Sequence, residues 1–313
     1  MRIVAGSGRS GTTWVLDCLA EANRLRPVFE PLHQSVTPIG AKYAYRVLPS
    51  DAECPDLAQF LLGYDTGTQR SIWTTYRGRP DLLMPGVRSL GSMEELRRLR
   101  RRWVKFLRGV PGLRAASRQP GSLIKDIRFN LCLGWMVRAL AAKAVLVVRH
   151  PCAVVESQFR LGQPWDPEPI LRRYQADPHL SEFTGGRYDR LLHQPLDRLE
   201  ALTLLWLIEN QVPEARSAEL GYVIIYYEDL LDHDEEGWRL MARALGLANI
   251  PPPALLRRPS QQATAGGSVR GDLLRPAWMA ALAGKQLGSI QRMLDAAEYA
   301  TYNVTTSLPV RTC

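Results

Sequence analysis

The sequence predicts an α/β fold with a central parallel sheet, and three observations lead to that prediction. Residues 3–5 form a short apolar run, followed by a glycine-rich turn and a segment whose apolar side chains have helical spacing. Residues 144–148 are almost purely apolar, which is typical of a strand buried on both faces of a parallel sheet. The other predicted strands alternate with helical patterns and cover residues 27–30, 122–129 and 222–227. We therefore expect one α/β domain over residues 1–313, with helices flanking the sheet.

Composition and charge limit the classes of protein to which the chain can belong. Of the 313 residues, 46% are hydrophobic and 23% are charged, which is ordinary for a globular domain. The five cysteines are far apart and show no zinc or disulfide spacing, so we expect a reducing, cytoplasmic compartment. The net charge of +9 suits a polyanionic ligand, whereas no nucleic-acid-binding module is visible. The glycine-rich turn begins at residue 6, so we expect no signal peptide or membrane anchor before it. No later apolar run reaches the ~20 residues of a transmembrane helix, which favours a soluble protein or a trimmed form of a longer one.

The first predicted strand, turn and helix form a site for an anion. Such a turn surrounds the anion with backbone N–H groups and with the start of a helix. The segment nearly matches the nucleotide-binding pattern G-x-x-x-x-G-K-[ST], since Gly6, Gly11 and Thr13 fit it. Thr12 occupies the lysine position, and the cation is instead Arg9, inside the turn. We therefore do not expect the ligand to be a γ-phosphate with magnesium.

The same residues resemble a known family. The run from Arg9 to Trp14, RSGTTW, resembles the 5′-phosphosulfate loop of sulfotransferases that use 3′-phosphoadenosine 5′-phosphosulfate (PAPS). The resemblance implies a three-layer fold similar to that of P-loop NTPases. It also implies that the 5′-phosphosulfate is held by Arg9, Ser10, Gly11, Thr12 and Thr13, and that Trp14 borders the adenine.

A second motif follows the apolar run 144–148. The segment VVRHPCAVVESQFRLG resembles the motif with which this family binds the 3′-phosphate, and it supplies Arg149 and Ser157, the latter on a helix that begins near Pro151. A P-loop kinase often has a magnesium-binding aspartate where this strand ends in Arg149. His150 is expected to play no chemical part.

Two further segments match the family less specifically. The run YEDL places Tyr227 near the adenine, and Glu228 and Asp229 are expected to cap the following segment. Arg270, which precedes Trp278, resembles part of a loop that closes over the 3′-phosphate.

The acceptor side is predicted from the strands over 27–30 and 122–129. Ligands of open α/β sheets bind outside the carboxyl ends of the strands, where Glu30 lies. The segment PVFEPLH resembles the F-E-P segment of carbohydrate-type sulfotransferases, which makes Glu30 the expected base and His33 a secondary acceptor-site candidate. Lys125, in SLIKDIRF, resembles the lysine that points at the transferred sulfuryl group. In the phenol and steroid branch a catalytic histidine stands two residues later, where this chain has Ile127.

Longer segments are expected to build the acceptor pocket. Residues 34–120 carry mixed signals of loops and short helices, and residues 163–195 are expected to form a long loop. Residues 94–107 form a predicted amphipathic helix with a basic face, which contacts solvent, an acidic acceptor or a membrane surface. Residues 196–209 are predicted as a helix on the sheet, and residues 276–300 as one closing helix.

Together these residues predict a sulfotransferase that moves a sulfuryl group from PAPS to a hydroxyl. The product would be adenosine 3′,5′-bisphosphate (PAP), and no metal is expected. Catalysis is assigned to Glu30, Lys125 and Arg9. The acceptor stays open between a small molecule, a sugar and a lipid. Two alternatives are a P-loop kinase that acts on a small molecule and a non-catalytic protein that binds PAP.

Overall fold

The fold is built on a five-stranded parallel sheet. The computed structural model describes residues 1–71, 74, 121–231, 235–258 and 276–310. The strand order is β2-β3-β1-β4-β5, so that β1 (Arg2–Ala5) lies in the centre of the sheet. This arrangement confirms the predicted α/β class. The chain moves to one side of β1 for β2 (Arg26–Phe29) and β3 (Ser122–Asp126), and to the other side for β4 (Lys143–Val148) and β5 (Val223–Tyr226).

The strand register places the predicted site residues along one edge. Ala5 pairs with Asp126 on one side and with Leu146 on the other, and Phe29 pairs with Lys125. Because all five strands are parallel, the residues that follow them meet at the carboxyl edge of the sheet. The fold thereby brings the glycine-rich turn of residues 6–11, called the anion loop from here on, together with the residues that follow β2, β4 and β5.

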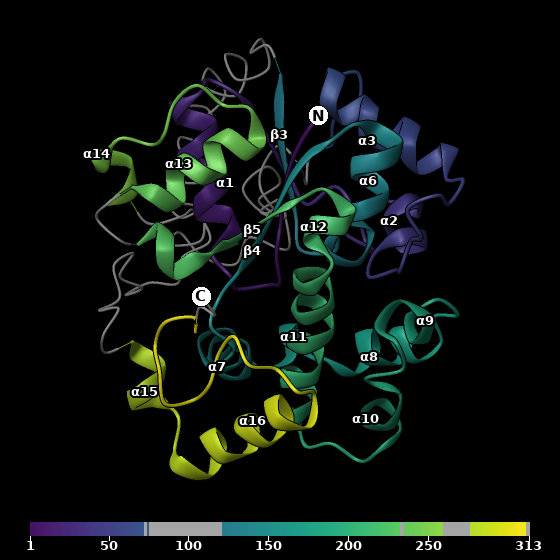
Figure 1. The fold of residues 1–313 in the computed structure, drawn as a ribbon. Helices are drawn as coiled ribbons and strands as arrows, with labels where there is room; N and C mark the ends of the chain where they lie inside the picture. Colours follow the sequence, from purple (N-terminus) through teal and green to yellow (C-terminus); the bar gives the residue numbers. More distant parts are fainter. Residues whose placement is uncertain (72–73, 75–120, 232–234, 259–275, 311–313) are drawn as a thin grey trace, which may run out of the picture.

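Helices cover both faces of the sheet. Side chains of β1 alternate, with Val4 in the core beneath α1 (Thr12–Ala22) and α13 (Glu236–Leu245), and Ile3 in the opposite core. In Figure 1, α1 and α13 lie on one side of the strands, and α3 (Pro55–Thr66) and α6 (Leu133–Leu140) lie on the other. The sheet is therefore the middle of three layers, which agrees with the nearly continuous apolar runs of β1 and β4.

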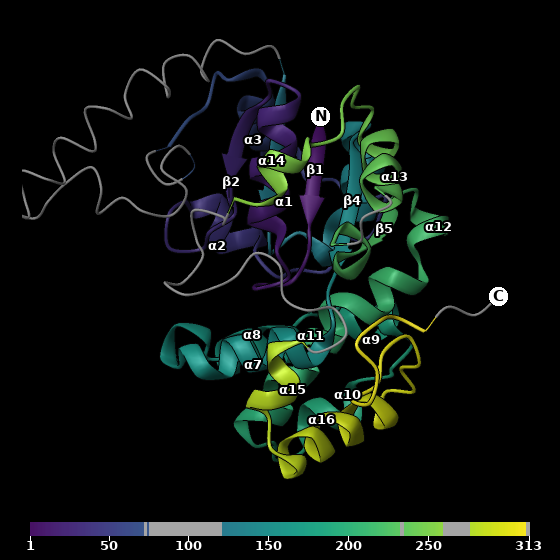
Figure 2. The ribbon, with the colours of Figure 1, turned by 90° about the vertical axis from the view of Figure 1, so that its left-hand side faces the viewer.

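More helices lie beyond the carboxyl edge of the sheet. Figure 2 shows β1 and β2 pointing toward the part of the molecule formed by α7 (Pro151–Leu161), α11 (Arg198–Ala215), α15 (Ala277–Ala281) and α16 (Gly284–Ala296). α11 packs against both α7 and α16, and it also contacts β4, as predicted for a helix on the sheet. Asp197 caps its start by accepting a hydrogen bond from the backbone of Glu200.

The remaining described elements are α2 (Pro38–Tyr43), η2 (Asn130–Cys132), η3 (Gln163–Trp165), α8 (Glu168–Gln175), α9 (Leu180–Thr184), α10 (Asp189–His193), α12 (Ser217–Leu220), η4 (Tyr227–Leu230) and α14 (Pro253–Leu256). Within the described ranges, no helix combines the length and apolar character needed to cross a membrane.

Two segments differ from their predicted structure. The prediction of a long loop over residues 163–195 is wrong, because this segment contains η3, α8, α9 and α10. Their prolines and glycines mark the ends of short helices: proline lies in the first turn of η3 and α8, and Gly185 ends α9 in the left-handed conformation. Residues 276–300 form two helices instead of one, since the backbone is extended at Leu282 and Ala283.

Candidate active site

The anion loop connects β1 to α1. Gly6 has a φ of +153°, and a Cβ there would lie 2.5 Å from the carbonyl oxygen of Val147. Gly11 has a φ of +85°, and a Cβ there would lie 2.2 Å from the ring of Tyr227. Glycine is therefore required at both ends of the turn. α1 starts directly after Gly11, and no side chain caps its first N–H groups. These donors are available to an anion.

Side chains from elements that are distant in the sequence hold the anion loop in place. The Oδ1 atom of Asn130 accepts a hydrogen bond from the Gly6 N–H at 3.1 Å, and Gln158 Nε2 donates to the Gly8 carbonyl at 2.8 Å. Asn210 Nδ2 donates to Ser7 Oγ at 2.6 Å. Three separate segments thus hold the turn, two of them through its backbone, so its N–H groups are positioned before a ligand arrives.

Two arginines and a serine join the anion loop to α7 and to the end of β4. Arg149 donates from Nη1 to the carbonyl of Arg9 at 3.0 Å, and Arg9 donates from Nε to Ser157 Oγ at 3.0 Å. Burial lowers the pKa of Arg9, and the positive charge of Arg149 lowers it further. Among the residues that the structure describes, neither arginine forms an ion pair with a carboxylate. In the described part of the chain the two neighbouring cations thus lack an ion-paired carboxylate, an arrangement that a bound anion would stabilise.

Aromatic rings border this cationic pair. The Arg149 guanidinium lies 4.6 Å from the centre of the Tyr227 ring, which packs edge-to-face against Trp14 at 5.8 Å. Trp238 also packs edge-to-face against Trp14, at 5.3 Å between ring centres. The indole N–H of Trp14 is buried and has no hydrogen-bond partner in the described part of the chain. The rings thus lie directly beside the anion loop, with Tyr227 against Gly11. The adenine contacts of Trp14 and Tyr227 stay predictions.

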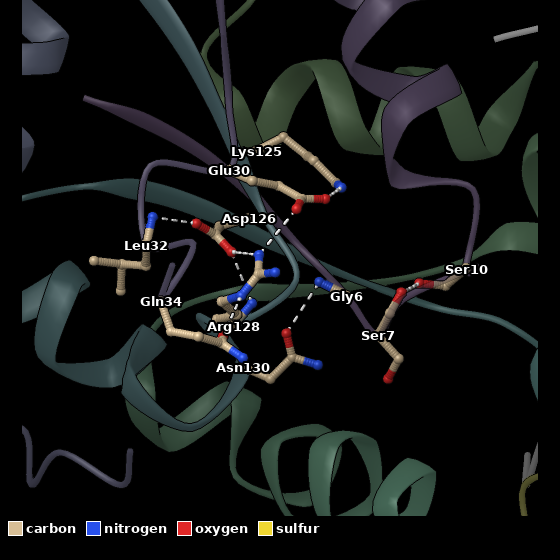
Figure 3. Close-up of polar contacts among 10 residues, drawn as sticks. All are labelled: Gly6, Ser7, Ser10, Glu30, Leu32, Gln34, Lys125, Asp126, Arg128 and Asn130. Atoms are coloured by element: carbon tan, nitrogen blue, oxygen red, sulfur yellow. Dashed lines mark hydrogen bonds and ion pairs between the residues drawn. The ribbon is translucent and has the colours of Figure 1, made fainter. Parts of the chain in front are cut away.

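The predicted acceptor side holds four buried charged residues, shown in Figure 3. Lys125 Nζ contacts Glu30 Oε1 at 2.5 Å, and Arg128 Nη1 contacts Glu30 Oε2 at 2.9 Å. Arg128 Nη1 also lies 3.2 Å from Asp126 Oδ1. Burial by itself raises the pKa of Glu30, but the two cations outweigh burial and lower that pKa to about 2. Glu30 is therefore ionised, with one cation on each oxygen.

The backbone at Glu30 is in an unusual conformation. Its φ is +46°, in the left-handed region that residues other than glycine rarely adopt, and its N–H donates to the Lys125 carbonyl at 2.6 Å. Arg9 in the anion loop has a φ of +75°. Such conformations cost on the order of 1–3 kcal/mol each and concentrate at functional sites. Two of the three predicted catalytic residues, Glu30 and Arg9, carry one.

His33 lies near this cluster and is half-buried. Burial lowers the pKa of His33 to about 4, and the charge of Arg128 contributes to that decrease. The imidazole is therefore neutral at pH 7. Its Nδ1 atom accepts a hydrogen bond from the Ser35 N–H at 3.3 Å.

The structure also bears on the remaining predicted residues. The expected capping role of Glu228 is wrong, because its buried carboxylate accepts hydrogen bonds from the His150 N–H and the Tyr302 hydroxyl. α13, the next helix, begins after Glu235 instead. His150 caps α7 through Nδ1 and stacks on Trp278, which agrees with a structural part. Arg270 and the predicted basic helix 94–107 lie outside the described residues.

Sequence reasoning assigned no role to four residues near the site. Trp165 covers the anion loop, since a Cβ at Gly8 would lie 2.1 Å from its ring. Glu209 is buried and hydrogen-bonded to Ser7, and burial raises its pKa to about 8. Asp126 and Arg128 belong to the segment that identified Lys125, so their proximity to it was a usable signal.

A cavity in the described part of the chain borders this site only at Asn130. It has a volume of about 410 Å³ and is lined by residues 47–51, by α9, and by Arg216 and Tyr222. Asn130 is the residue that it shares with the support of the anion loop.

Within the described ranges, no group of three or more histidine, cysteine, aspartate or glutamate side chains is placed to hold a metal ion.

Comparisons with known proteins give the following results. No protein-family model and no curated protein matches the chain. Among solved structures, it is similar to a sulfotransferase domain from the curacin biosynthetic pathway, with 16% identity over 96% of this chain and 97% of that chain and a TM-score of 0.41. A sulfotransferase domain from the olefin synthase of Synechococcus PCC 7002 has 18% identity over 97% and 94%, with a TM-score of 0.46. A sulfotransferase from Alicyclobacillus acidocaldarius has 12% identity over 95% and 93%, with a TM-score of 0.36.

Proposed function

We propose that this protein is a sulfotransferase that moves a sulfuryl group from PAPS to an acceptor hydroxyl and releases PAP. The observation that carries the proposal is the linked set of Arg9, Arg149 and Ser157, beside the uncapped start of α1. Two anionic groups at the two ends of one ligand would use both parts of this set. PAPS has such ends, with a phosphosulfate at 5′ and a phosphate at 3′.

The donor would lie across the carboxyl edge of the sheet. The loop N–H groups, the hydroxyls of Thr12 and Thr13, and Arg9 would bind the 5′-phosphosulfate. Arg149 and the hydroxyl of Ser157 would bind the 3′-phosphate, with charge-assisted hydrogen bonds about twice as strong as neutral ones. The adenine would pack against the wall of Trp14 and Tyr227.

Transfer would proceed by in-line displacement at sulfur. The acceptor oxygen forms a bond to sulfur while the bond between sulfur and the bridging phosphate oxygen breaks, and PAP leaves with that electron pair. Lys125 and Arg9 would stabilise the negative charge on the sulfuryl and bridging oxygens. Glu30 would accept the proton of the acceptor hydroxyl, and His33 is the alternative base. The acceptor would be a small-molecule, sugar or lipid alcohol.

A kinase reaction is disfavoured by two residues. Thr12 replaces the lysine that would reach the β- and γ-phosphates of ATP, and Arg149 stands where a P-loop kinase often has its magnesium-binding aspartate.

The proposal is tested by incubating the protein with 35S-labelled PAPS and fractionated small molecules from its source cells. Labelled product, identified by mass spectrometry, is expected with the wild-type protein and not with Arg9→Ala. PAP binding without any transfer would favour the non-catalytic alternative. Product formation that requires ATP and magnesium instead of PAPS would refute the proposal in favour of a kinase.

A further inference from the structure

Arg128 holds the predicted base from the side opposite Lys125. Its Nη1 atom lies 2.9 Å from Glu30 Oε2 and 3.2 Å from Asp126 Oδ1, and its side chain is 6% exposed. Lys125 occupies the other oxygen of Glu30. Each oxygen of the Glu30 carboxylate therefore has its own cationic partner.

Arg128 is itself fixed by several contacts. Its Nε atom donates to Gln34 Oε1 at 3.2 Å, and its guanidinium lies 5.7 Å from the centre of the Tyr45 ring. Asp126 is fully buried and accepts hydrogen bonds from the backbone N–H groups of Leu32 at 2.7 Å and Arg128 at 3.0 Å. The arginine thus connects Glu30 to a carboxylate that the backbone holds in place.

Lys125 and Arg128 have different roles in the proposed sulfuryl transfer. In the proposed reaction Lys125 must contact the sulfuryl group, so its Nζ atom must leave Glu30 Oε1. That departure exposes one oxygen to the acceptor hydroxyl. Without a second partner, Glu30 would be a buried charge with no counter-ion, which is strongly unfavourable. Its side chain would then be free to rotate away from the acceptor.

We propose that Arg128 is a positioning residue, which holds Glu30 Oε2 so that Oε1 stays aimed at the acceptor hydroxyl when Lys125 moves to the sulfuryl group. The inference rests on the proposed function for the destination of Lys125. The contact between Arg128 and Glu30 can be tested without any acceptor.

The test compares Arg128→Met with Arg128→Lys and with the control Arg46→Met. Arg46 also contacts a buried carboxylate, Asp177, at 3.4 Å, but no ion pair joins Arg46 to Glu30 in the described structure. The pKa of the Glu30 carboxyl is measured by NMR on protein labelled with 13C at glutamate carboxylates, and its signal is assigned from its absence in Glu30→Gln. Thermal unfolding of each variant is measured in parallel.

In Arg128→Met, the pKa of Glu30 is expected to increase by about 1 to 3 pH units, the usual effect of an adjacent opposite charge. Arg128→Lys and Arg46→Met should leave that pKa near its wild-type value. An unchanged pKa in folded Arg128→Met, or an equal increase in Arg46→Met, would overturn the inference.

The turnover number kcat then shows whether Arg128 positions Glu30 or contributes only its positive charge. Arg128→Lys keeps the charge but not the planar fork, so kcat should fall by about 10- to 100-fold while the KM for PAPS stays constant, as for a misplaced catalytic group. A wild-type kcat in Arg128→Lys would refute positioning, and this variant decides the question if Arg128→Met does not fold. If the wild-type protein transfers no sulfuryl group at all, the proposed function fails, and the NMR titration still decides the contact between Arg128 and Glu30.

Discussion

Replacing Arg149 with alanine tests whether the two ends of the donor are bound separately. Arg149 contributes a charge at the proposed 3′-phosphate and a neutral hydrogen bond to the Arg9 carbonyl. A hydrogen bond to a charged group is worth about 1.5–3 kcal/mol, so loss of the 3′-phosphate contact should weaken PAP binding by about 10- to 100-fold. The lost bond to Arg9 is worth about 1 kcal/mol, or about 5-fold.

Calorimetry with two ligands separates these contributions. PAP carries both phosphates, whereas adenosine 5′-phosphate lacks the 3′ group. The variant should lose its large factor with PAP and no more than about 5-fold with adenosine 5′-phosphate, because only the loop contact is then affected. The control is Arg172→Ala, an exposed arginine that pairs with Glu168 on α8 and should change neither affinity.

Equal losses with both ligands would refute the reasoning, since they would show that Arg149 supports the loop without binding the 3′-phosphate. Unchanged affinity for PAP would refute it as well. Thermal unfolding of the variant shows whether a loss of binding comes from a loss of folding.

Three further predictions concern the base, the anion loop and the buried carboxyl behind it. Glu30→Gln should keep PAP affinity and lose turnover by about 100-fold or more, measured as steady-state kcat, and near-normal turnover would transfer the role to the alternative base. Arg9→Ala and Ser157→Ala should be non-additive in PAP binding, because each removes the same 3.0 Å contact; additive losses in the double-mutant cycle would contradict their coupling. The pKa of Glu209 is raised from 4.5 to about 8, so its contribution to stability is full below about pH 4.5 and is lost as pH rises through 8. Thermal melts should therefore show Glu209→Gln gaining stability over wild type as pH rises from about 5 to 9, by at most about 5 kcal/mol, whereas parallel curves would contradict the buried ionisation.

The position of most site residues could be predicted from the sequence. Glu30, Lys125 and Arg149 each stand at or just after the end of an apolar run, and parallel strands end at a shared edge. The anion loop was equally accessible, because its glycines are required by local geometry. These features depend on a few consecutive residues, so a local pattern is enough to find them.

The contacts between segments could not be predicted in the same way. Arg9 and Ser157 are separated by 148 positions, and no local pattern states that their side chains meet. The left-handed backbone at Glu30 was also hidden, because a glutamate does not signal a positive φ as glycine does. Arg128 lies in the segment SLIKDIRF, from which Lys125 was predicted. Its contact with Glu30, however, depends on the pairing of β2 with β3.

The central claim is that one ligand with two anionic ends is bound across the anion loop and the pair Arg149 and Ser157. A crystal structure of the protein with PAP tests it most directly. The account predicts the 5′-phosphate on the backbone N–H groups of Gly8 to Thr13 and the 3′-phosphate on Arg149 and Ser157. Density for the adenosine bisphosphate away from both segments, or a divalent ion bridging it to the loop, would contradict the account.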